Sequence, residues 1–151
     1  MYKYIKSSAT FNENNQRVNL KRIWNIDIEI CICIGNKPST ANHLDEDKTT
    51  STMIKILYNN DYGGFILVNI GQESIKELLG EIRKYEESDI VLCWGSKCHK
   101  QNKNKIGEFF SKLKEKKLEK YVKCFKKNKD KSPSQPTYLA YKTNIKNYFD
   151  I

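Results

Sequence analysis

The chain has 151 residues, 38% of them hydrophobic, and a formal net charge of +9. This length predicts a single domain, 1–151, with one core. No apolar stretch reaches the roughly 20 residues of a membrane span, and the first six residues do not resemble a signal peptide. These features exclude an integral membrane protein and lead us to expect a cytoplasmic protein without a membrane partner.

The positive charge is concentrated in one part of the chain. Residues 97–131 contain fourteen lysines and four acidic residues. A basic surface attracts phosphates, so a nucleotide or nucleic acid is the expected partner. The alternative is that the lysines only solvate a helix face and a loop.

The five cysteines are an odd number, which argues for reduced thiols rather than a disulfide framework. Cys31 and Cys33 lie on one face of a predicted buried strand, where thiols behave as small apolar side chains. The Cys93, Cys98 and His99 spacing is loose for zinc and has no second half-site. We therefore predict neither a metal nor a cofactor, and the sequence leaves the oligomeric state open.

Hydrophobic periodicity predicts strands alternating with helices. The strands expected first are a hairpin of 8–11 with 17–24 and a buried strand over 28–34, where Ile30 to Ile34 run into a polar turn. The remaining elements, in chain order, are a helix over 49–60, a strand over 65–70, a helix over 75–85, a strand over 89–94, a loop over 95–99, a helix over 103–117, a strand over 121–125, a lysine-rich loop over 126–136, and closing segments over 137–141 and 145–149.

This order predicts the α/β class, with a three-layer α/β/α arrangement, a mainly parallel four-stranded central sheet and an N-terminal β-hairpin. In such a sheet the carboxyl ends of the parallel strands share one rim. The loops that follow the predicted strands should therefore meet there, although they are far apart in the sequence.

The rim loops supply the candidate ligand-binding residues. Amide, hydroxyl and ammonium groups can bind a base edge or a phosphate, and an indole ring can stack on a base. Simpler alternatives are an ordinary turn after the first strand, an Asn69 that satisfies loop backbone, and a Trp94 that caps the core. The candidates are Asn36, Lys37, Ser39, Thr40, Asn42, Asn69, Trp94 and Gln135.

Several motifs in this order resemble an uncharacterised bacterial and phage family, a domain of unknown function. Its signature is a strand followed by Asn-Pro-Ser-Thr-Ala-Asp, matched here by Lys37-Pro-Ser-Thr-Ala-Asn42. The other similar segments are Ala9-Thr-Phe11, Leu20 to Trp24, Tyr62-Gly-Gly64, Val68-Asn69, Trp94-Gly95 and Gln135-Pro-Thr-Tyr-Leu139.

That family in turn resembles the uracil-DNA glycosylase superfamily, which places a polar, Pro-containing loop after its first core strand and a His-Pro loop after its last. The resemblance implies a glycosylase-like fold and a pocket that accepts a flipped base. This chain departs from the family pattern at Lys37, Asn42 and Gln135, where the family has Asn, Asp and His. The matching carboxylate and imidazole are therefore missing.

Three functional hypotheses follow. The first is a nucleotide- or nucleic-acid-binding protein with a glycosylase-like pocket and lost catalysis. The second is an N-glycosidic bond hydrolase acting on a nucleobase, in which Lys37, with a lowered pKa, is the catalytic nucleophile. The third is a phage-type protein that sequesters a nucleotide signal or a host factor. Whether the protein is an enzyme stays open at this point.

Overall fold

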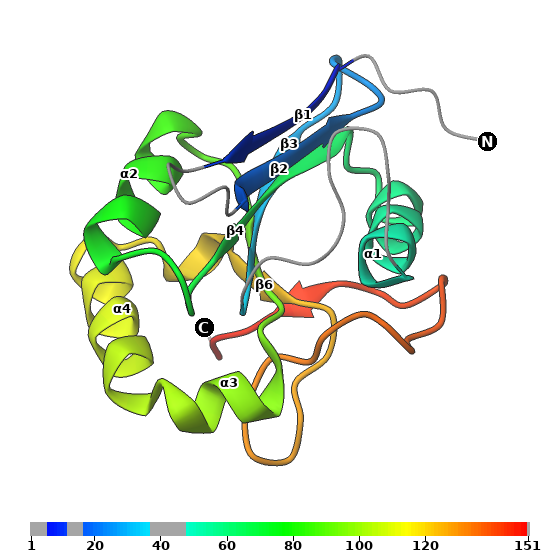
Figure 1. The fold of residues 1–151 in the computed structure, drawn as a ribbon. Coiled ribbons are helices and arrows are strands. Elements are labelled where there is room, and N and C mark those ends of the chain that lie inside the picture. The colour runs from blue at the N-terminus through cyan, green and yellow to red at the C-terminus, as the bar shows by residue number, and fades with distance from the viewer. Residues whose placement is uncertain (1–5, 12–16, 37–47, 151) are drawn as a thin grey trace.

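The computed structural model describes residues 6–11, 17–36 and 48–150 (Figure 1). Within these ranges the helices and strands alternate along most of the chain. They are β1 (Lys6–Phe11), β2 (Arg17–Ile23), β3 (Ile30–Gly35), α1 (Lys48–Asn59), β4 (Gly64–Asn69), α2 (Ile75–Lys84), β5 (Ile90–Leu92), α3 (Gly95–Gln101), α4 (Lys103–Glu115), a 3-10 turn (Glu119–Tyr121), β6 (Val122–Cys124) and β7 (Lys146–Asn147).

The strands of the described residues form one mixed, seven-stranded sheet in the order β1-β2-β4-β3-β5-β6-β7. β3 pairs in parallel with both β4 and β5, and β5 pairs in parallel with β6. β1 with β2, β2 with β4, and β6 with β7 are antiparallel. The antiparallel pairs therefore lie toward the two edges of the sheet.

Local sequence explains the central elements. β3 is a run of apolar and thiol residues, and it is buried on both faces, as expected for an inner strand. α2 begins at a capping box: the backbone N–H of Glu77 donates to Ser74 Oγ at 3.1 Å, and the N–H of Ser74 donates to Glu77 Oε1 at 2.9 Å. Arg83 and Lys84 in its last turn complement the helix dipole.

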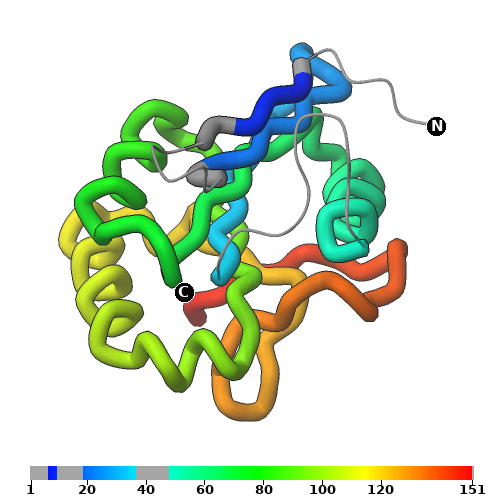
Figure 2. The backbone as a smooth tube through the Cα atoms, in the orientation of Figure 1, coloured from blue at the N-terminus to red at the C-terminus, as the bar shows by residue number. Residues whose placement is uncertain are grey.

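Side chains that alternate along the inner strands divide the core in two, one part on each face of the sheet. Ile32 and Ile34 of β3 face α2 and α4, in a cluster that includes Leu78 and Phe109. Cys31 and Cys33 face the opposite way, toward α1. The backbone view shows these layers, with α2 and α4 together on one side and α1 on the other (Figure 2).

The α/β class predicted from the sequence is confirmed. In the described ranges the sheet is mixed and has seven strands, more than the four predicted for the central sheet. The residues expected to form a loop over 95–99 instead begin a helix, α3. That prediction was wrong because a glycine following a strand was interpreted as a turn. Gly95 does have φ of +84°, but the helix starts directly at it. None of the described helices is both long and apolar enough to cross a membrane.

Candidate ligand-binding hollow

The order of the strands marks one place where a ligand would be expected. From β3 the chain passes through α1 to β4 on one side, whereas from β5 it passes through α3 and α4 to β6 on the other. Neighbouring strands whose connections leave in opposite directions form a topological switch point. The carboxyl ends of β3 and β5 therefore border a crevice of the kind in which open α/β sheets bind ligands.

A hollow of about 190 Å³ lies at the carboxyl ends of these strands. Its lining comes from the ends of β3, β4 and β5, from the start of α1 and from the loop after β6. The lining residues are Gly35, Asn36, Thr49, Thr50, Met53, Leu67, Asn69, Cys93 and Gln135. The structure thus brings together Asn36, Asn69 and Gln135, three of the residues that the sequence predicted for this site.

Asn69 is the polar group that stands out in this lining. It ends β4, and only 1% of it is exposed to solvent. Its Nδ2 is buried and has no hydrogen-bond partner among the described residues. A buried donor without an acceptor costs about 1–3 kcal/mol, so a side chain held in this state is a candidate for binding a ligand acceptor.

The backbone of Asn69 is hydrogen-bonded to the side chain of Glu73. The N–H of Asn69 donates to Glu73 Oε2 at 2.6 Å, and Lys105 Nζ donates to the Ile70 carbonyl at 2.5 Å. Burial raises the pKa of Glu73 to about 7, more than the hydrogen bond from Asn69 lowers it. Glu73 was not predicted from the sequence, although its place four residues after a buried Asn is the signal that could have identified it.

The backbone after β4 lies so close to the end of β3 that a side chain at Gly71 would collide with Asn36. The N–H of Ile70 donates to the Gly35 carbonyl at 2.9 Å, and the N–H of Gly71 donates to the Asn36 carbonyl at 2.7 Å. A Cβ added at Gly71 would lie 2.4 Å from that Asn36 oxygen. Asn36 and Asn69 are therefore fixed relative to each other by backbone contacts.

Gln135 comes from the loop after β6, which is tied to α3. Asp130 accepts hydrogen bonds from the hydroxyl of the buried Ser132, from Ser96 Oγ and from the backbone N–H of Ser132. These hydrogen bonds hold the pKa of Asp130 well below its usual range. The N–H of Gly95 also donates to the Pro133 carbonyl at 2.8 Å. The loop thus delivers the exposed Gln135 to the rim of the hollow.

The remaining lining groups are neutral and already bonded or protonated. Thr49 Oγ1 and Thr137 Oγ1 share a hydrogen bond of 2.7 Å. Burial raises the pKa of Cys93 to about 12, so this thiol is not a nucleophile at neutral pH. The described lining contains no lysine, arginine or acidic side chain, and its polar members are amide, hydroxyl and thiol groups.

Trp94 does not belong to this site, which corrects the sequence-based prediction. It is fully buried, and its Nε1–H donates to His99 Nδ1 at 3.1 Å while its ring lies against His99 and Phe110. This burial agrees with the alternative of a core cap, because Trp94 belongs to the buried cluster between the sheet and α2 and α4. Lys37, Ser39, Thr40 and Asn42 lie outside the described residues.

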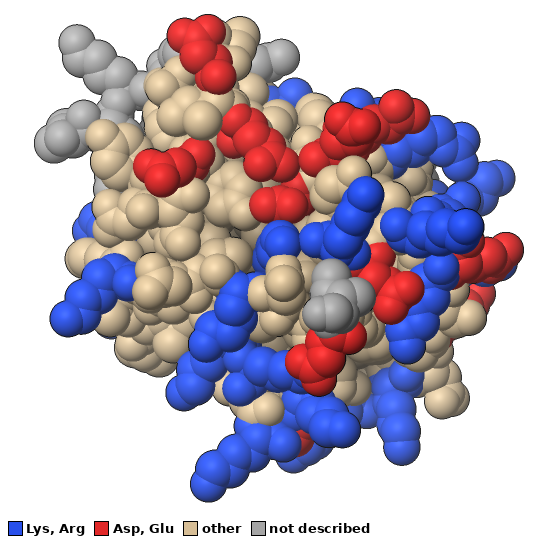
Figure 3. All heavy atoms as spheres, turned by 180° about the vertical axis from the view of Figure 1, so that it is seen from behind, with Lys and Arg blue, Asp and Glu red and all other residues tan. Residues whose placement is uncertain are grey.

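Positive charge gathers on one face of the molecule, and the described residues show no metal site. Lys and Arg side chains dominate the lower part of the molecular face shown in Figure 3, while acidic side chains gather toward its top. Lys103 and Lys114 on α4 are among the exposed lysines. Across the described ranges, no group of three or more His, Cys, Asp or Glu side chains is placed to hold a metal ion.

Fold and hollow together define an α/β protein with a small hollow, lined by uncharged residues in the described part of the chain, at the switch point of its sheet. A family model described as "Protein of unknown function (DUF1643)" matches residues 17–78, which run from β2 to the first turn of α2 and include Asn36 and Asn69. This match supports the resemblance to an uncharacterised family. No curated protein and no solved structure matches the chain.

Proposed function

We propose that the hollow binds the base of a nucleotide or of a nucleic acid. One observation carries this proposal: the buried Nδ2 of Asn69, which lines the hollow, has no hydrogen-bond partner among the described residues. An amide presents a donor and an acceptor side by side, which complements the carbonyl and N–H edge of a base. Gln135 at the rim adds a second amide.

The size and charge of the hollow support a base rather than a whole nucleotide. Pockets for drug-sized ligands usually occupy about 300 Å³ or more, whereas this one has about 190 Å³. A single planar ring with its edge groups suits that space. The sugar and phosphate would then remain outside, where the exposed lysines of the molecule favour them. The glycosylase-like pocket inferred from the family resemblance is part of this proposal.

The first experiment is a calorimetric titration of the protein with the four nucleoside monophosphates and with a short single-stranded DNA at low salt. Asn69→Asp keeps the shape of the side chain but removes the donor, so binding should weaken about tenfold or more. Asn104→Asp, an exposed change on α4 with the same effect on net charge, is the matched control. No binding to any of these ligands by the unmodified protein would overturn the proposal.

Incubating the protein with the same ligands and testing for free base distinguishes binding from hydrolysis. In the hydrolase alternative the neutral amine of Lys37 attacks the anomeric carbon of the sugar, the C–N bond to the base breaks, and the base leaves with the proton that the attacking amine gives up. Water then hydrolyses the bond between Lys37 and the sugar. Chromatography of the reaction mixture would detect free base. Base released by the unmodified protein but not by Lys37→Ala would establish the hydrolase. Intact ligand after prolonged incubation would leave binding as the function.

A further inference from the structure

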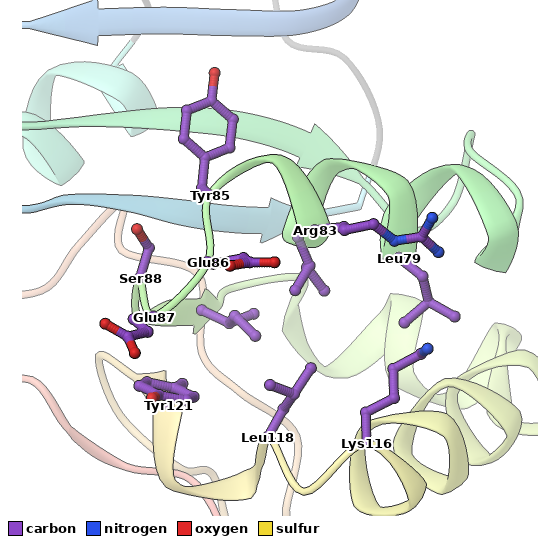
Figure 4. A pocket seen from close by; sticks show the side chains of 11 residues that line it. Leu79, Arg83, Tyr85, Glu86, Glu87, Ser88, Lys116, Leu118 and Tyr121 are labelled. Atoms are coloured by element: carbon purple, nitrogen blue, oxygen red, sulfur yellow. The ribbon is translucent and has the colours of Figure 1, made fainter.

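A second pocket, of about 390 Å³, lies at the start of β5, at the other end of the parallel strands from the hollow. It opens between the C-terminal ends of α2 and α4, in front of the start of β5 (Figure 4). Its walls are apolar or aromatic. They are formed by Leu79, Ile82, Tyr85, Ile90, Leu118 and Tyr121.

The pocket is an opening into the core rather than a groove on a polar surface. Ile82 and Ile90 belong to the buried cluster between the sheet and the helices, and Leu79, Leu118 and Tyr121 pack against that cluster while staying partly exposed. The pocket therefore leaves apolar surface in contact with water. An apolar ligand would gain free energy in proportion to the area of this surface that it covers.

Two unusual turns frame the opening. Glu87, after α2, has φ of +64°, and Lys117, after α4, has φ of +58°. Left-handed backbone is uncommon for residues other than glycine. Here it turns the chain sharply away from the two helix ends, and the space between those ends is the pocket. Its walls come from regular elements and short turns, so the cavity is present without a ligand.

Charge at the mouth is arranged unevenly. Figure 4 shows the Arg83 guanidinium and the Lys116 ammonium at the same end, while the Glu87 carboxylate lies at the other end above Tyr121. Within the described part of the chain neither Arg83 nor Lys116 has a salt-bridge partner; the bridges found there join Lys84 to Glu81 and Lys112 to Glu115. Glu86 is also on the rim. One end of the mouth thus has two cations that form no salt bridge with a described residue, and the carboxylates of Glu86 and Glu87 disfavour a second anion elsewhere on the rim.

We propose that this pocket binds a small organic molecule with an apolar, ring-containing body and a single anionic group. The body would fill the space between Leu79, Leu118 and Tyr121, and the anionic group would lie between Arg83 and Lys116. The volume is within the range of small-molecule sites and too small for a folded partner. Because the pocket and the hollow lie at opposite ends of the parallel strands and share no lining residue, this proposal does not rest on the proposed base-binding function.

The probe is 8-anilinonaphthalene-1-sulfonate, a fluorescent aromatic molecule with one sulfonate. We expect saturable binding to the intact protein. Changing both cations, Arg83→Gln with Lys116→Gln, should weaken this binding about fivefold or more, because both charge-assisted contacts are lost. The matched control is Lys76→Gln with Lys103→Gln, which removes two exposed charges from the opposite ends of the same helices and should change binding less than about twofold.

Two results would overturn the proposal. One is equal weakening in the two double variants, which would mean that only net charge attracts the probe. The other concerns location: in ¹⁵N-labelled protein, the probe should shift the amide signals of residues 79–90 and 116–121, and shifts confined to other regions would place it elsewhere. This second measurement needs no variant, so it decides even where a substitution impairs folding.

Discussion

The backbone N–H of Asn69 donates to the carboxyl of Glu73 across 2.6 Å, so a buried acid positions the residue whose Nδ2 has no hydrogen-bond partner in the described part of the chain. Burial raises the pKa of this acid from 4.5 to about 7. The folded protein therefore holds the Glu73 proton more tightly than the unfolded chain does. The geometry of the site is consequently linked to pH near neutrality.

The first prediction concerns stability and pH. Because folding favours the protonated form, the contribution of Glu73 is fully present below about pH 4.5 and is lost as the pH rises through about 7. After allowance for solvent screening, we expect the free energy of unfolding to fall by about 1–2 kcal/mol across this range. Glu73→Gln, which keeps an acceptor for Asn69, should remove this decrease.

Urea unfolding at several pH values measures the effect. His99 acts in the opposite direction, since burial lowers its pKa and its contribution is lost as the pH falls below 6.5. The difference between the unmodified protein and Glu73→Gln isolates the acid from this background. Glu108→Gln, an exposed change on α4, should keep the original pH dependence. Parallel curves for all three proteins would rule out a role for Glu73.

The second prediction tests the contact between the ends of β3 and β4. Gly71→Ala would place a methyl group 2.4 Å from the Asn36 carbonyl oxygen. We expect a loss of about 1–3 kcal/mol in the free energy of unfolding, because backbone must shift to make room. Base binding in the hollow should weaken as well, since Asn36 and Asn69 would move apart.

Gly80→Ala is the natural counterpart. This glycine lies inside α2, and an added Cβ would meet nothing within 4 Å. Alanine is the better helix former, so the change should raise the free energy of unfolding by about 0.5–1 kcal/mol. Thermal and urea unfolding of both variants give the comparison. Equal effects of the two substitutions would contradict the tight contact at Gly71.

The third prediction concerns the thiols. All five cysteines are free and buried, and burial raises the pKa of Cys93 to about 12 and shifts that of Cys98 upward. Thiolate is the reactive form, so Ellman's reagent should react slowly with the native protein at about pH 8. In guanidinium chloride five thiols should react rapidly. A fast phase in the native protein would show that a cysteine is accessible.

The fourth prediction concerns the buried indole. In Trp24→Phe, Trp94 is the remaining tryptophan. Because Trp94 is fully buried, its fluorescence should resist acrylamide, and a bound base should not quench it by stacking. The complementary variant, Trp94→Phe, reports on the half-buried Trp24 as a reference. Strong quenching of Trp94 by a nucleotide would restore the stacking role that the sequence suggested.

The sequence identified Asn69 as a candidate for the site, misplaced Trp94 and gave no indication of Glu73. Asn69 stood out because a polar residue at the end of an apolar strand has few ways to be satisfied, and the parallel order of the strands implied a shared rim. Trp94 was misplaced because an indole at a strand end fits either a rim or a core. Glu73 was missed because a carboxylate that starts a helix is usually exposed.

By itself the amino-acid sequence determined the alternation of strands and helices, the burial of β3 and the helix that follows β4, since these depend on side-chain period and local hydrogen bonds. Only the tertiary structure decided which loops meet, which way Trp94 turns, and that a second pocket opens between α2 and α4. These features depend on contacts between residues far apart in the chain, and such contacts are set by how whole elements pack and not by the pattern of any one of them.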